Sequence, residues 1–416
     1  MFARPCRIEF GLSFCFRTAS LLCVMNAYSL FRRATTALTL LATILGLATT
    51  NSSAEELAPI FNGTTLSGWK AVGGAVFETR DGVILGKTGD GTYGWLCAEK
   101  QYGDFILELD VNITSGNSGV QIRSHLPDGK TMVGYQIEVD PTMRAWSGGL
   151  YEQGRRGWLQ NLTNNPAARA AFKVGEWNKY RIECVGASIK SWVNGVPATD
   201  YLDAMDLDGL IALQVHSGQN AEVRFRNLRL QDLGRHVWRA AWNGTDFSQG
   251  HMIGKGEWKI EDAVIHATHS KDEKEFGHFV SNNSLADFTV RLKYKSVKGN
   301  SGLYFRIEEK GATGVSGFQA EIDAEKDAGG LYETNGRAWV SQPSPADVKR
   351  WFKPQDWNTM TVYAHGRHLA TDVNGLRAAE LRDDPGRTKG HFALQLHGGM
   401  DVEVFFKDIE MLVNED

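Results

Sequence analysis

A polar side chain stands at every second position of the segment GYQIEVD in the first half of the chain. These side chains are Gln136, Glu138 and Asp140. In a strand, alternate side chains point to the same face, so the amide and the two carboxylates would stand side by side. Carboxylates serve as general acids and bases, and amides bind hydroxyl groups. The segment therefore predicts a face that can bind a polar ligand and act on it.

Two further segments of the same half show this alternation. Gln121 and Arg123 share a face in GVQIRSH, and Gln214 and His216 share one in ALQVH. An imidazole adds a base that is active near neutral pH, and a guanidinium adds a fixed cation. We predict that these side chains join Glu138 on one polar face.

The second half repeats this set of side chains. The corresponding residues are Arg306, Gln319, Glu321, Asp323, Gln395 and His397. The outer face of an antiparallel sheet is often polar, so a solvated face is the alternative interpretation for any single residue. Because the same residue types recur in the same order in halves that differ elsewhere, we interpret the set as a ligand-binding face. Planar amides and carboxylates suit sugar hydroxyls, which both donate and accept hydrogen bonds.

Aromatic side chains could add a flat surface for a sugar ring. Tyr151 and Tyr332 follow the polar segments of the two halves, and Trp192 lies further along the first half. Packing in a core is the alternative for each of them. Asp372 stands in the second half where the first has Trp192, so the two halves need not bind the same ligand.

The chain is an internal duplication. NSGVQIRS at Asn117 returns as NSGLYFRI at Asn300, and GYQIEVD at Gly134 returns as GFQAEID at Gly317. The repeated segments keep their order, and the repeat is far too long for a solenoid. We therefore predict two domains of one fold, over residues 55–232 and 233–416.

Within each half the hydrophobic pattern has the period of a strand. A short helix is predicted over residues 165–173, and the VNG sequences of both halves predict tight hairpin turns. Many antiparallel strands in domains of this length favour an all-β sandwich of two sheets, or a jelly roll.

Residues 1–54 differ from the rest of the chain. From Met25, which we take as the true start, a short basic stretch, an apolar run and small residues indicate an export signal cleaved before Glu55. An uncleaved anchor is the alternative, although the apolar run is short for a membrane span. We expect a mature chain without a stable membrane span, in the periplasm or outside the cell. The net charge of −4 offers no basic surface for nucleic acid.

Cys97 and Cys184 are the cysteines that remain after such a cleavage. Both alternate with apolar neighbours, so we predict two small buried hydrophobic side chains. A disulfide between them is the alternative in an oxidising compartment.

Several segments of the first half together resemble the 3-keto-disaccharide hydrolase domain family. In chain order they are FNGTTLSGW, NSGVQIRS, GYQIEVD, GGLYE, GEWNKYRIEC, WVNG and GLIALQVHSG. The second half is a weaker match. The resemblance implies an all-β fold of two tandem concanavalin A-like jelly-roll β-sandwiches. It also implies an exported bacterial hydrolase or lyase that acts on 3-keto-glycosides or disaccharides.

The reaction implied by this resemblance proceeds through an elimination. A ketone at C3 makes the proton on C2 acidic, so a base can remove it, the glycosidic oxygen can leave, and water can then add. As a hypothesis, Glu138 or His216 is the base, Asp140 is the acid, and Arg123 stabilises the enolate. Direct hydrolysis by two carboxylates is less favoured, because Glu138 and Asp140 lie side by side on one strand.

Two other interpretations remain open. The same face would serve a carbohydrate-binding protein without catalysis. Glu138, Asp140 and His216 could also hold Ca²⁺ or a transition metal, although no HxxxH or Cys-x-x-Cys spacing indicates a dedicated zinc site. We expect no cofactor, and no P-loop or dinucleotide fingerprint occurs in the sequence.

Overall fold

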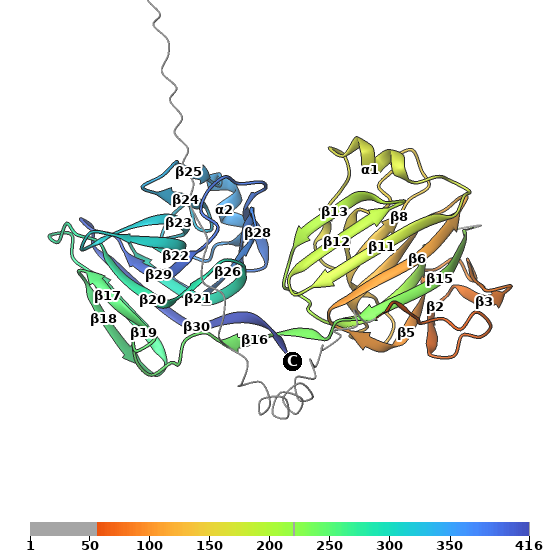
Figure 1. Ribbon diagram of the computed structural model, residues 1–416, viewed down its shortest axis with the longest axis horizontal. Coiled ribbons are helices and arrows are strands. Elements are labelled where there is room, and N and C mark those ends of the chain that lie inside the picture. The colour runs from red at the N-terminus through yellow and green to blue at the C-terminus, as the bar shows by residue number, and fades with distance from the viewer. Residues whose placement is uncertain (1–55, 219–220, 416) are drawn as a thin grey trace, which may run out of the picture. The chain divides into compact units, whose positions relative to one another are not determined.

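The computed structural model describes residues 56–218 and 221–415. The predicted export signal, residues 1–54, lies outside the described residues. In the described part of the chain the strands form four sheets, two in each half, and neighbouring strands pair antiparallel (Figure 1). The predicted fold class, two tandem concanavalin A-like β-sandwiches, is confirmed.

The first copy contains an eight-stranded and a seven-stranded sheet within the described residues, drawn from orange to green in Figure 1. The eight-stranded sheet consists of β1 (Ala58–Pro59), β3 (Val76–Arg80), β4 (Val83–Lys87), β6 (Phe105–Ile113), β11 (Asn178–Val185), β12 (Ser188–Val193), β13 (Val196–Leu202) and β15 (Glu222–Asp232). The seven-stranded sheet consists of β2 (Trp69–Gly73), β5 (Gly94–Tyr102), β7 (Ser118–His125), β8 (Val133–Val139), β9 (Leu150–Gln153), β10 (Gly157–Gln160) and β14 (Gly209–Val215).

The second copy repeats this pair of sheets in the described residues. Its eight-stranded sheet consists of β16 (Arg235–Ala240), β18 (Glu257–Glu261), β19 (Val264–His269), β21 (Phe288–Lys298), β26 (Asn358–His365), β27 (His368–Val373), β28 (Leu376–Leu381) and β30 (Val402–Glu415). Its seven-stranded sheet consists of β17 (Gly250–Gly254), β20 (Gly277–Leu285), β22 (Asn300–Lys310), β23 (Gly314–Asp323), β24 (Leu331–Thr334), β25 (Ala338–Ser341) and β29 (Gly390–Leu396).

The two copies have one strand order. In the first copy the sheets run β13-β12-β11-β6-β15-β4-β3 and β10-β9-β8-β7-β14-β5-β2. In the second they run β28-β27-β26-β21-β30-β19-β18 and β25-β24-β23-β22-β29-β20-β17. The strand that opens each copy, β1 or β16, pairs with β15 or β30. The duplication seen in the sequence is therefore a duplication of the whole topology.

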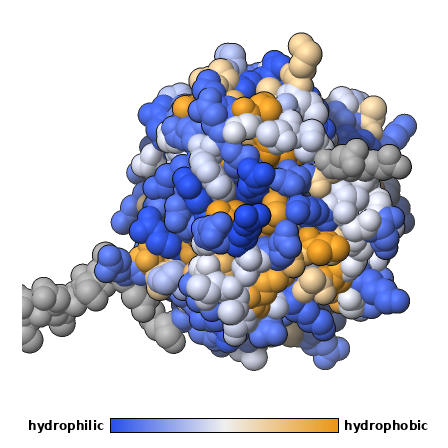
Figure 2. Space-filling view, turned by 90° about the vertical axis from the view of Figure 1, so that its right-hand side faces the viewer, coloured by the Kyte–Doolittle hydropathy of each residue, from blue (hydrophilic) through white to orange (hydrophobic). Residues whose placement is uncertain are grey.

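Each copy buries its own core between its two sheets. Leu107 on β6 and Val120 on β7 belong to one cluster of buried side chains, and Leu292 on β21 and Leu303 on β22 belong to a separate cluster. On the face of the molecule in Figure 2, hydrophilic residues dominate and apolar residues gather in small groups. The period-two alternation of the strands thus places one set of side chains in the core and leaves the other set on the outer faces.

Two local predictions are confirmed. The helix α1 (Pro166–Ala171) is capped at its N-terminus by Asn165, whose side chain accepts a hydrogen bond of 3.1 Å from the backbone N–H of Ala168. Between β12 and β13, Asn194 and Gly195 have φ angles of 50° and 80°. A two-residue hairpin turn needs both central residues in this left-handed region, and Asn-Gly adopts it with little strain. The second copy has a corresponding helix, α2 (Pro345–Trp351).

Cys97 and Cys184 are both free and buried, in separate clusters of apolar side chains. The disulfide alternative is therefore wrong, and the prediction of two buried hydrophobic side chains is confirmed. Burial raises the pKa of the Cys97 thiol to about 11 and that of Cys184 to about 12. In residues 56–218 and 221–415, no helix is long and apolar enough to cross a membrane.

Candidate functional site

A cavity of about 520 Å³ lies on the outer face of the seven-stranded sheet in the first copy. Strands β8, β9, β10 and β14 and the loops beside them contribute its walls. It is lined by Tyr93, Asn117, Gln136, Glu138, Asp140, Thr142, Arg144, Tyr151, Gln153, Trp158, Gln214 and His216. The predicted site residues Gln136, Glu138, Asp140, Tyr151, Gln214 and His216 are therefore brought together.

The register of the strands sets the order of these side chains. Gln121 on β7 pairs with Gln136 on β8, Gln136 pairs with Tyr151 on β9, and Tyr151 pairs with Trp158 on β10. Gln121 lies beneath the cavity, where its amide donates a 2.6 Å hydrogen bond to Gln136. Gln136 in turn donates a 2.9 Å bond to Glu138. A chain of amides thus orients the buried carboxylate from one side.

Gly119 makes room for this chain. It pairs with Glu138 across β7 and β8, and a Cβ atom at this position would lie 2.4 Å from Cδ of Gln136. The amide of Gln136 therefore occupies the space that any larger residue at position 119 would take.

Glu138 is almost completely buried and accepts three hydrogen bonds. Its Oε1 accepts from Asn117 at 2.7 Å and from the Nη2 of Arg144 at 2.6 Å, and its Oε2 accepts from Gln136. Burial raises the pKa of Glu138, and the bond from Asn117 and the charge of Arg144 offset part of that rise. Both carboxylate oxygens are thus already held by the protein.

Asp140 has the opposite electrostatic balance. Burial acts to raise its pKa, but hydrogen bonds from Thr142, from Arg144 and from the backbone of Trp146 outweigh burial and lower it. The Nε of Arg144 donates to Asp140 at 2.8 Å. An aspartate whose pKa is lowered stays ionised near neutral pH, so the environment does not favour the predicted role of Asp140 as an acid.

Arg144 is the charged residue of the site that sequence reasoning missed. It bridges Glu138 and Asp140, and its guanidinium lies 5.0 Å from the ring centre of Trp146 and 5.1 Å from that of Trp158. Trp158 also meets Tyr151 edge to face, with the ring centres 5.2 Å apart. Strand alternation gave no signal for Arg144, because it lies in the loop between β8 and β9.

His216 presents its Nε2 to a phenol. Its Nδ1 lies 2.9 Å from the carbonyl oxygen of Ser217, and its Nε2 lies 3.0 Å from the hydroxyl of Tyr93. Since a carbonyl only accepts, Nδ1 carries a proton, and in the neutral ring the lone pair of Nε2 accepts the hydrogen bond from Tyr93. The pair is further fixed by an edge contact between the two rings, with centres 4.5 Å apart.

Arg123 does not lie on this face. The pairing of β7 with β8 shifts between Ile122 and His125, and Arg123 has a φ of 45°. Such a bulge reverses the alternation of side chains that the sequence pattern assumed. The fully buried guanidinium instead donates to Asp104 at 2.8 Å and to the carbonyls of Gly103 and Gly186. The prediction that Arg123 shares the polar face is wrong.

Two other predicted contacts are wrong for related reasons. Arg306 has a φ of 50° at a register shift between β22 and β23, and it donates to the carbonyls of Ala286 and Gly366. Trp192 lies on β12, in the eight-stranded sheet, where it pairs with Arg181. The cavity is on the other sheet.

In the second copy the remaining predicted residues occupy the equivalent strands. Gln319 and Glu321 lie on β23, Gln395 lies on β29, and all three are almost fully buried. The amide of Gln319 donates to Glu321 at 3.0 Å and to Gln395 at 3.1 Å. Tyr332 on β24 pairs with Gln319 and with Trp339. Asp323 and His397 are half-buried at the ends of β23 and β29.

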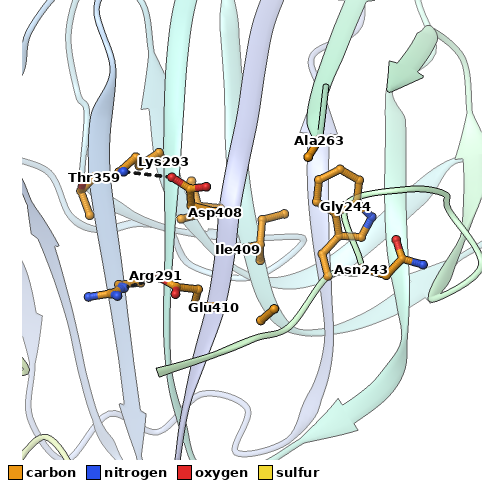
Figure 3. A pocket seen from close by; sticks show the side chains of 12 residues that line it. Asn243, Gly244, Ala263, Arg291, Lys293, Thr359, Asp408, Ile409 and Glu410 are labelled. Atoms are coloured by element: carbon orange, nitrogen blue, oxygen red, sulfur yellow. Dashed lines mark hydrogen bonds and ion pairs between the residues drawn. The ribbon is translucent and has the colours of Figure 1, made fainter. Parts of the chain in front are cut away.

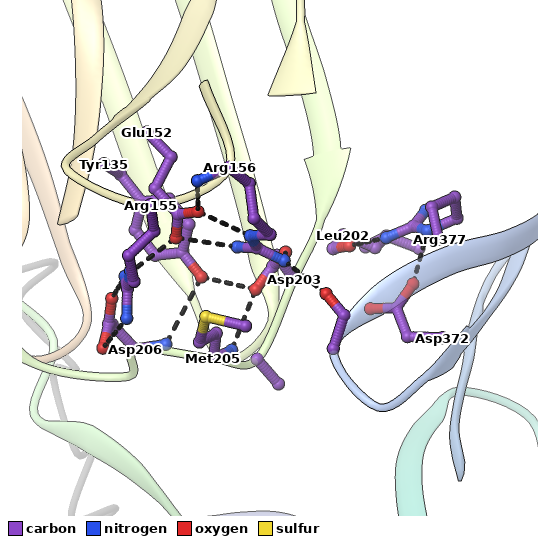
Figure 4. A network of polar contacts seen from close by, with 12 residues as sticks. Tyr135, Glu152, Arg155, Arg156, Leu202, Asp203, Met205, Asp206, Asp372 and Arg377 are labelled. Carbon is purple, nitrogen blue, oxygen red and sulfur yellow. Dashed lines mark hydrogen bonds and ion pairs between the residues drawn. The ribbon is translucent and has the colours of Figure 1, made fainter. Parts of the chain in front are cut away.

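A polar network beneath the hairpin of β9 and β10 supports the aromatic wall of the cavity (Figure 4). Arg156 pairs with Glu152 at 2.5 Å and with Asp203 at 2.8 Å, and Tyr135 donates to Asp203. Arg337, Glu333 and Asp384 repeat this arrangement in the second copy. The repetition in both copies indicates a structural role in holding the hairpin.

A different cavity, of about 550 Å³, lies beside the eight-stranded sheet of the second copy (Figure 3). Its charged side chains bind one another: Arg291 pairs with Glu410 at 2.7 Å, and Lys293 pairs with Asp408 at 2.9 Å. It has no imidazole and no row of amides among its lining side chains, so it is a weaker candidate for a ligand site than the cavity of the first copy.

Within the described residues, no group of three His, Cys, Asp or Glu side chains is arranged to hold a metal ion. In the predicted set of Glu138, Asp140 and His216, both carboxylates bind Arg144 instead. A fixed cation thus occupies the position that a metal would have needed.

The sequence matches the family model of the 3-keto-alpha-glucoside-1,2-lyase-like domain twice, over residues 56–231 and 237–412. The chain belongs to this family. The predicted resemblance and the two tandem copies are thereby confirmed. No curated protein matches the sequence.

Among solved structures, the chain is similar to a candidate glycosyl hydrolase from Parabacteroides distasonis, with 18% identity and a TM-score of 0.32 over 43% of this chain and 94% of that one. It is also similar to a carbohydrate-binding module from Bacillus subtilis, with 18% identity and a TM-score of 0.31 over 39% and 95% of the two chains. Membership of the family supports a carbohydrate-active role for this chain.

Proposed function

We propose that the first copy acts on 3-keto-glycosides, by removing the proton on C2 and expelling the glycosidic oxygen from C1. The observation that carries the proposal is the cavity itself. It joins a basic imidazole, a fixed cation and a pair of aromatic rings over a row of amides. These are the groups that such an elimination and a sugar ring require.

His216 is the better placed of the two predicted bases. Its Nε2 lines the cavity and accepts one hydrogen bond from the neutral hydroxyl of Tyr93, whereas the carboxylate of Glu138 is held by Asn117, Gln136 and the charged Arg144. In the step we propose, the hydroxyl of Tyr93 turns away, Nε2 takes the proton from C2, and the C–H electron pair forms an enolate with C3. The enolate re-forms the ketone as its electron pair moves into a C1=C2 double bond and the C1–O bond breaks, and the imidazolium returns the proton to the departing oxygen.

Arg144 takes the role that the sequence suggested for Arg123. Charge develops on the C3 oxygen as the proton leaves, and a guanidinium already fixed by Glu138 and Asp140 can stabilise it without rearrangement. Under this proposal Glu138 and Asp140 are positioning residues for Arg144. Their hydrogen bonds to its Nε and Nη2 leave the third nitrogen, Nη1, for the substrate.

One buried polar atom that lines the cavity fits a hydroxylated ligand. Within the described residues, Oε1 of Gln214 is buried and has no hydrogen-bond partner. Unpartnered buried polar groups are rare in folded proteins. A sugar hydroxyl, or the water that it displaces, would satisfy this oxygen. The predicted export of the chain belongs to this proposal, since the substrate would then be met outside the cytoplasm.

The test is turnover by the chain from Glu55 onward, with a 3-keto-α-glucoside and its unoxidised parent as substrates. Mass spectrometry separates the elimination product from the hydrolysis product, which is heavier by one water. We expect turnover of the keto compound only. Glu138→Gln should reduce it by about 10²-fold or more, because Arg144 loses a charged partner. Glu321→Gln, the same change in the second copy, is the matched control and should have little effect.

Equal turnover of both substrates would contradict the elimination. Saturable binding of the glucoside without turnover of either compound would instead support the alternative, a carbohydrate-binding protein.

A further inference from the structure

The outer face of the second copy keeps the bond from glutamine to glutamate, now from Gln319 to Glu321, while Tyr304 stands where the first copy has Gln121. Glu321 pairs with Gly302 as Glu138 pairs with Gly119, and a Cβ at Gly302 would lie 2.5 Å from the amide nitrogen of Gln319. Tyr332 and Trp339 meet edge to face with ring centres 5.4 Å apart, as Tyr151 and Trp158 do in the first copy. The groups that would hold a sugar ring are therefore present twice.

Of the groups that we assign to catalysis, the imidazole is present in both copies and the guanidinium in the first alone. The loop after β23 reads DAEKDAGG where the first copy has DPTMRAWSGG, so it is two residues shorter and has no arginine, and Asp327 takes the place of Trp146 in its last turn. No ion pair of Glu321 occurs in residues 56–218 and 221–415; its partners there are Asn300 and Gln319.

The histidine of the second copy, His397, also lacks the phenol that binds His216 in the first copy. Phe276 contacts His397 with ring centres 4.5 Å apart, as Tyr93 does His216, but it has no hydroxyl to bind the Nε2. The Nδ1 of His397 still lies 2.8 Å from a backbone carbonyl, that of Gly398. The second site thus keeps its shape while it lacks the cation and the phenol.

We propose that this face is a second carbohydrate site, which binds neutral sugar through Gln319, Gln395 and an uncharged Glu321 and does not cleave it. Tyr332 and Trp339 form its aromatic wall. The inference goes beyond the function proposed for the first copy, because it concerns binding without turnover at separate residues.

The surroundings of Glu321 support an uncharged carboxyl. Burial raises its pKa to about 8, and the neighbouring carboxylates of Asp323 and Asp327 add to the rise. The bond from Asn300 and the charge of Lys326 act against it. On β20, burial lowers the pKa of His278 to about 4, so this imidazole is neutral as well. Near neutral pH, Glu321 therefore carries a proton that it can donate to a sugar oxygen.

This arrangement gives the second site a defined pH dependence. Below pH 8 the carboxyl is protonated and donates. Above pH 8 it ionises and can no longer donate to the ligand, and the partners that bind the buried anion, the amides of Asn300 and Gln319, carry no charge. We expect the affinity of the second site to fall by roughly tenfold per pH unit above pH 8.

The experiment measures binding of methyl α-glucoside by ligand-observed NMR, with the chain from Glu55 onward carrying Tyr151→Ala to remove the aromatic wall of the first copy. At pH 6.5 we expect binding that Tyr332→Ala removes. At pH 9.5 we expect binding to be weaker by about 30-fold, because a tenfold loss per pH unit acts over roughly 1.5 units. Adding Glu321→Gln, whose amide donates at every pH, should keep the binding and abolish its pH dependence. Circular dichroism and thermal unfolding check that each variant is folded.

The proposal is overturned if Tyr332→Ala and Glu321→Gln leave the glucoside titration unchanged at both pH values. It is also overturned if a 3-keto-α-glucoside is turned over and Glu321→Gln abolishes that turnover. Neither result depends on whether the first copy is an enzyme, so the two proposals can fail separately.

Discussion

The two copies carry the same glutamine and glutamate pair on equivalent strands, yet these pairs differ in their charged neighbours. Glu138 lies 2.6 Å from the guanidinium of Arg144, whereas Glu321 has Asp323 and Asp327 as charged neighbours. The position of this pair depends on strand alternation and on one glycine, and neither changes when the following loop changes. The charge is encoded in the loop after the strand. A duplicated sheet can therefore keep a binding face while a single loop decides which chemistry is added to it.

The largest expected difference between the copies concerns their histidines. If His216 is the base, His216→Ala should lower kcat/KM for the 3-keto-α-glucoside by about 10²- to 10⁴-fold. His397→Ala removes the equivalent side chain of the second copy and should change kcat/KM little. Steady-state kinetics of the two variants measure this directly. Similar losses in both would erase the distinction between the copies, and no loss in either would return the role of base to Glu138.

The buried arginines give a second comparison, in stability. Arg123 binds Asp104, which is 1% exposed, whereas Arg306 binds Asp287, whose side chain is 62% exposed. Arg123→Met takes the arginine from a buried carboxylate that keeps only His236 and the N–H of Gly186, so it should cost about 3–5 kcal/mol of the free energy of unfolding. Arg306→Met leaves its partner in water and should cost roughly 1–3 kcal/mol, mainly for lost hydrogen bonds.

Urea unfolding followed by circular dichroism measures both costs. Equal costs for the two variants would mean that the loss of hydrogen bonds to backbone carbonyls, and not the carboxylate that loses its arginine, accounts for most of the destabilisation. A stable Arg123→Met protein without turnover would mean that Arg123 reaches the substrate after all.

The sequence predicted those parts of the site that depend on strand alternation alone. Glu138 and Gln136 on β8 and Gln214 on β14 stand together because regular strands keep their parity. The prediction for Arg123 was wrong because a bulge with a positive φ reverses the alternation of side chains between the two faces. No residue type in the segment indicates that bulge. The prediction for Trp192 was wrong because alternation predicts that a side chain points outward but does not predict which of the two sheets carries it.

Two further residues of the site were not predicted from the sequence, one in a loop and one that makes a contact between distant segments. Arg144 follows Asp140 by four residues in an irregular segment, where spacing carries no geometric meaning. Tyr93 meets His216 from a part of the chain far away in sequence. The available signal was the difference between the halves: the loop of the second half is shorter and has no arginine, and Phe276 stands in place of Tyr93. Positions where two copies of a binding face disagree are thus as informative as those where they agree.

The smallest expected effect tests that reasoning at a single atom. Tyr93→Phe makes the first copy resemble the second, because it removes the hydroxyl that binds Nε2 of His216 and keeps the ring contact. If the hydroxyl only orients the imidazole, one neutral hydrogen bond worth about 1 kcal/mol is lost, and kcat/KM should fall by roughly fivefold. The reverse change, Phe276→Tyr, should add no turnover, since the second copy still lacks a cation.

A fall of more than about 10²-fold in Tyr93→Phe would show instead that the hydroxyl takes part in proton transfer, because an effect of that size is expected of a general acid or base. The phenol would then be the group that protonates the leaving oxygen, and its absence from the second copy would by itself explain why that copy binds without cleaving.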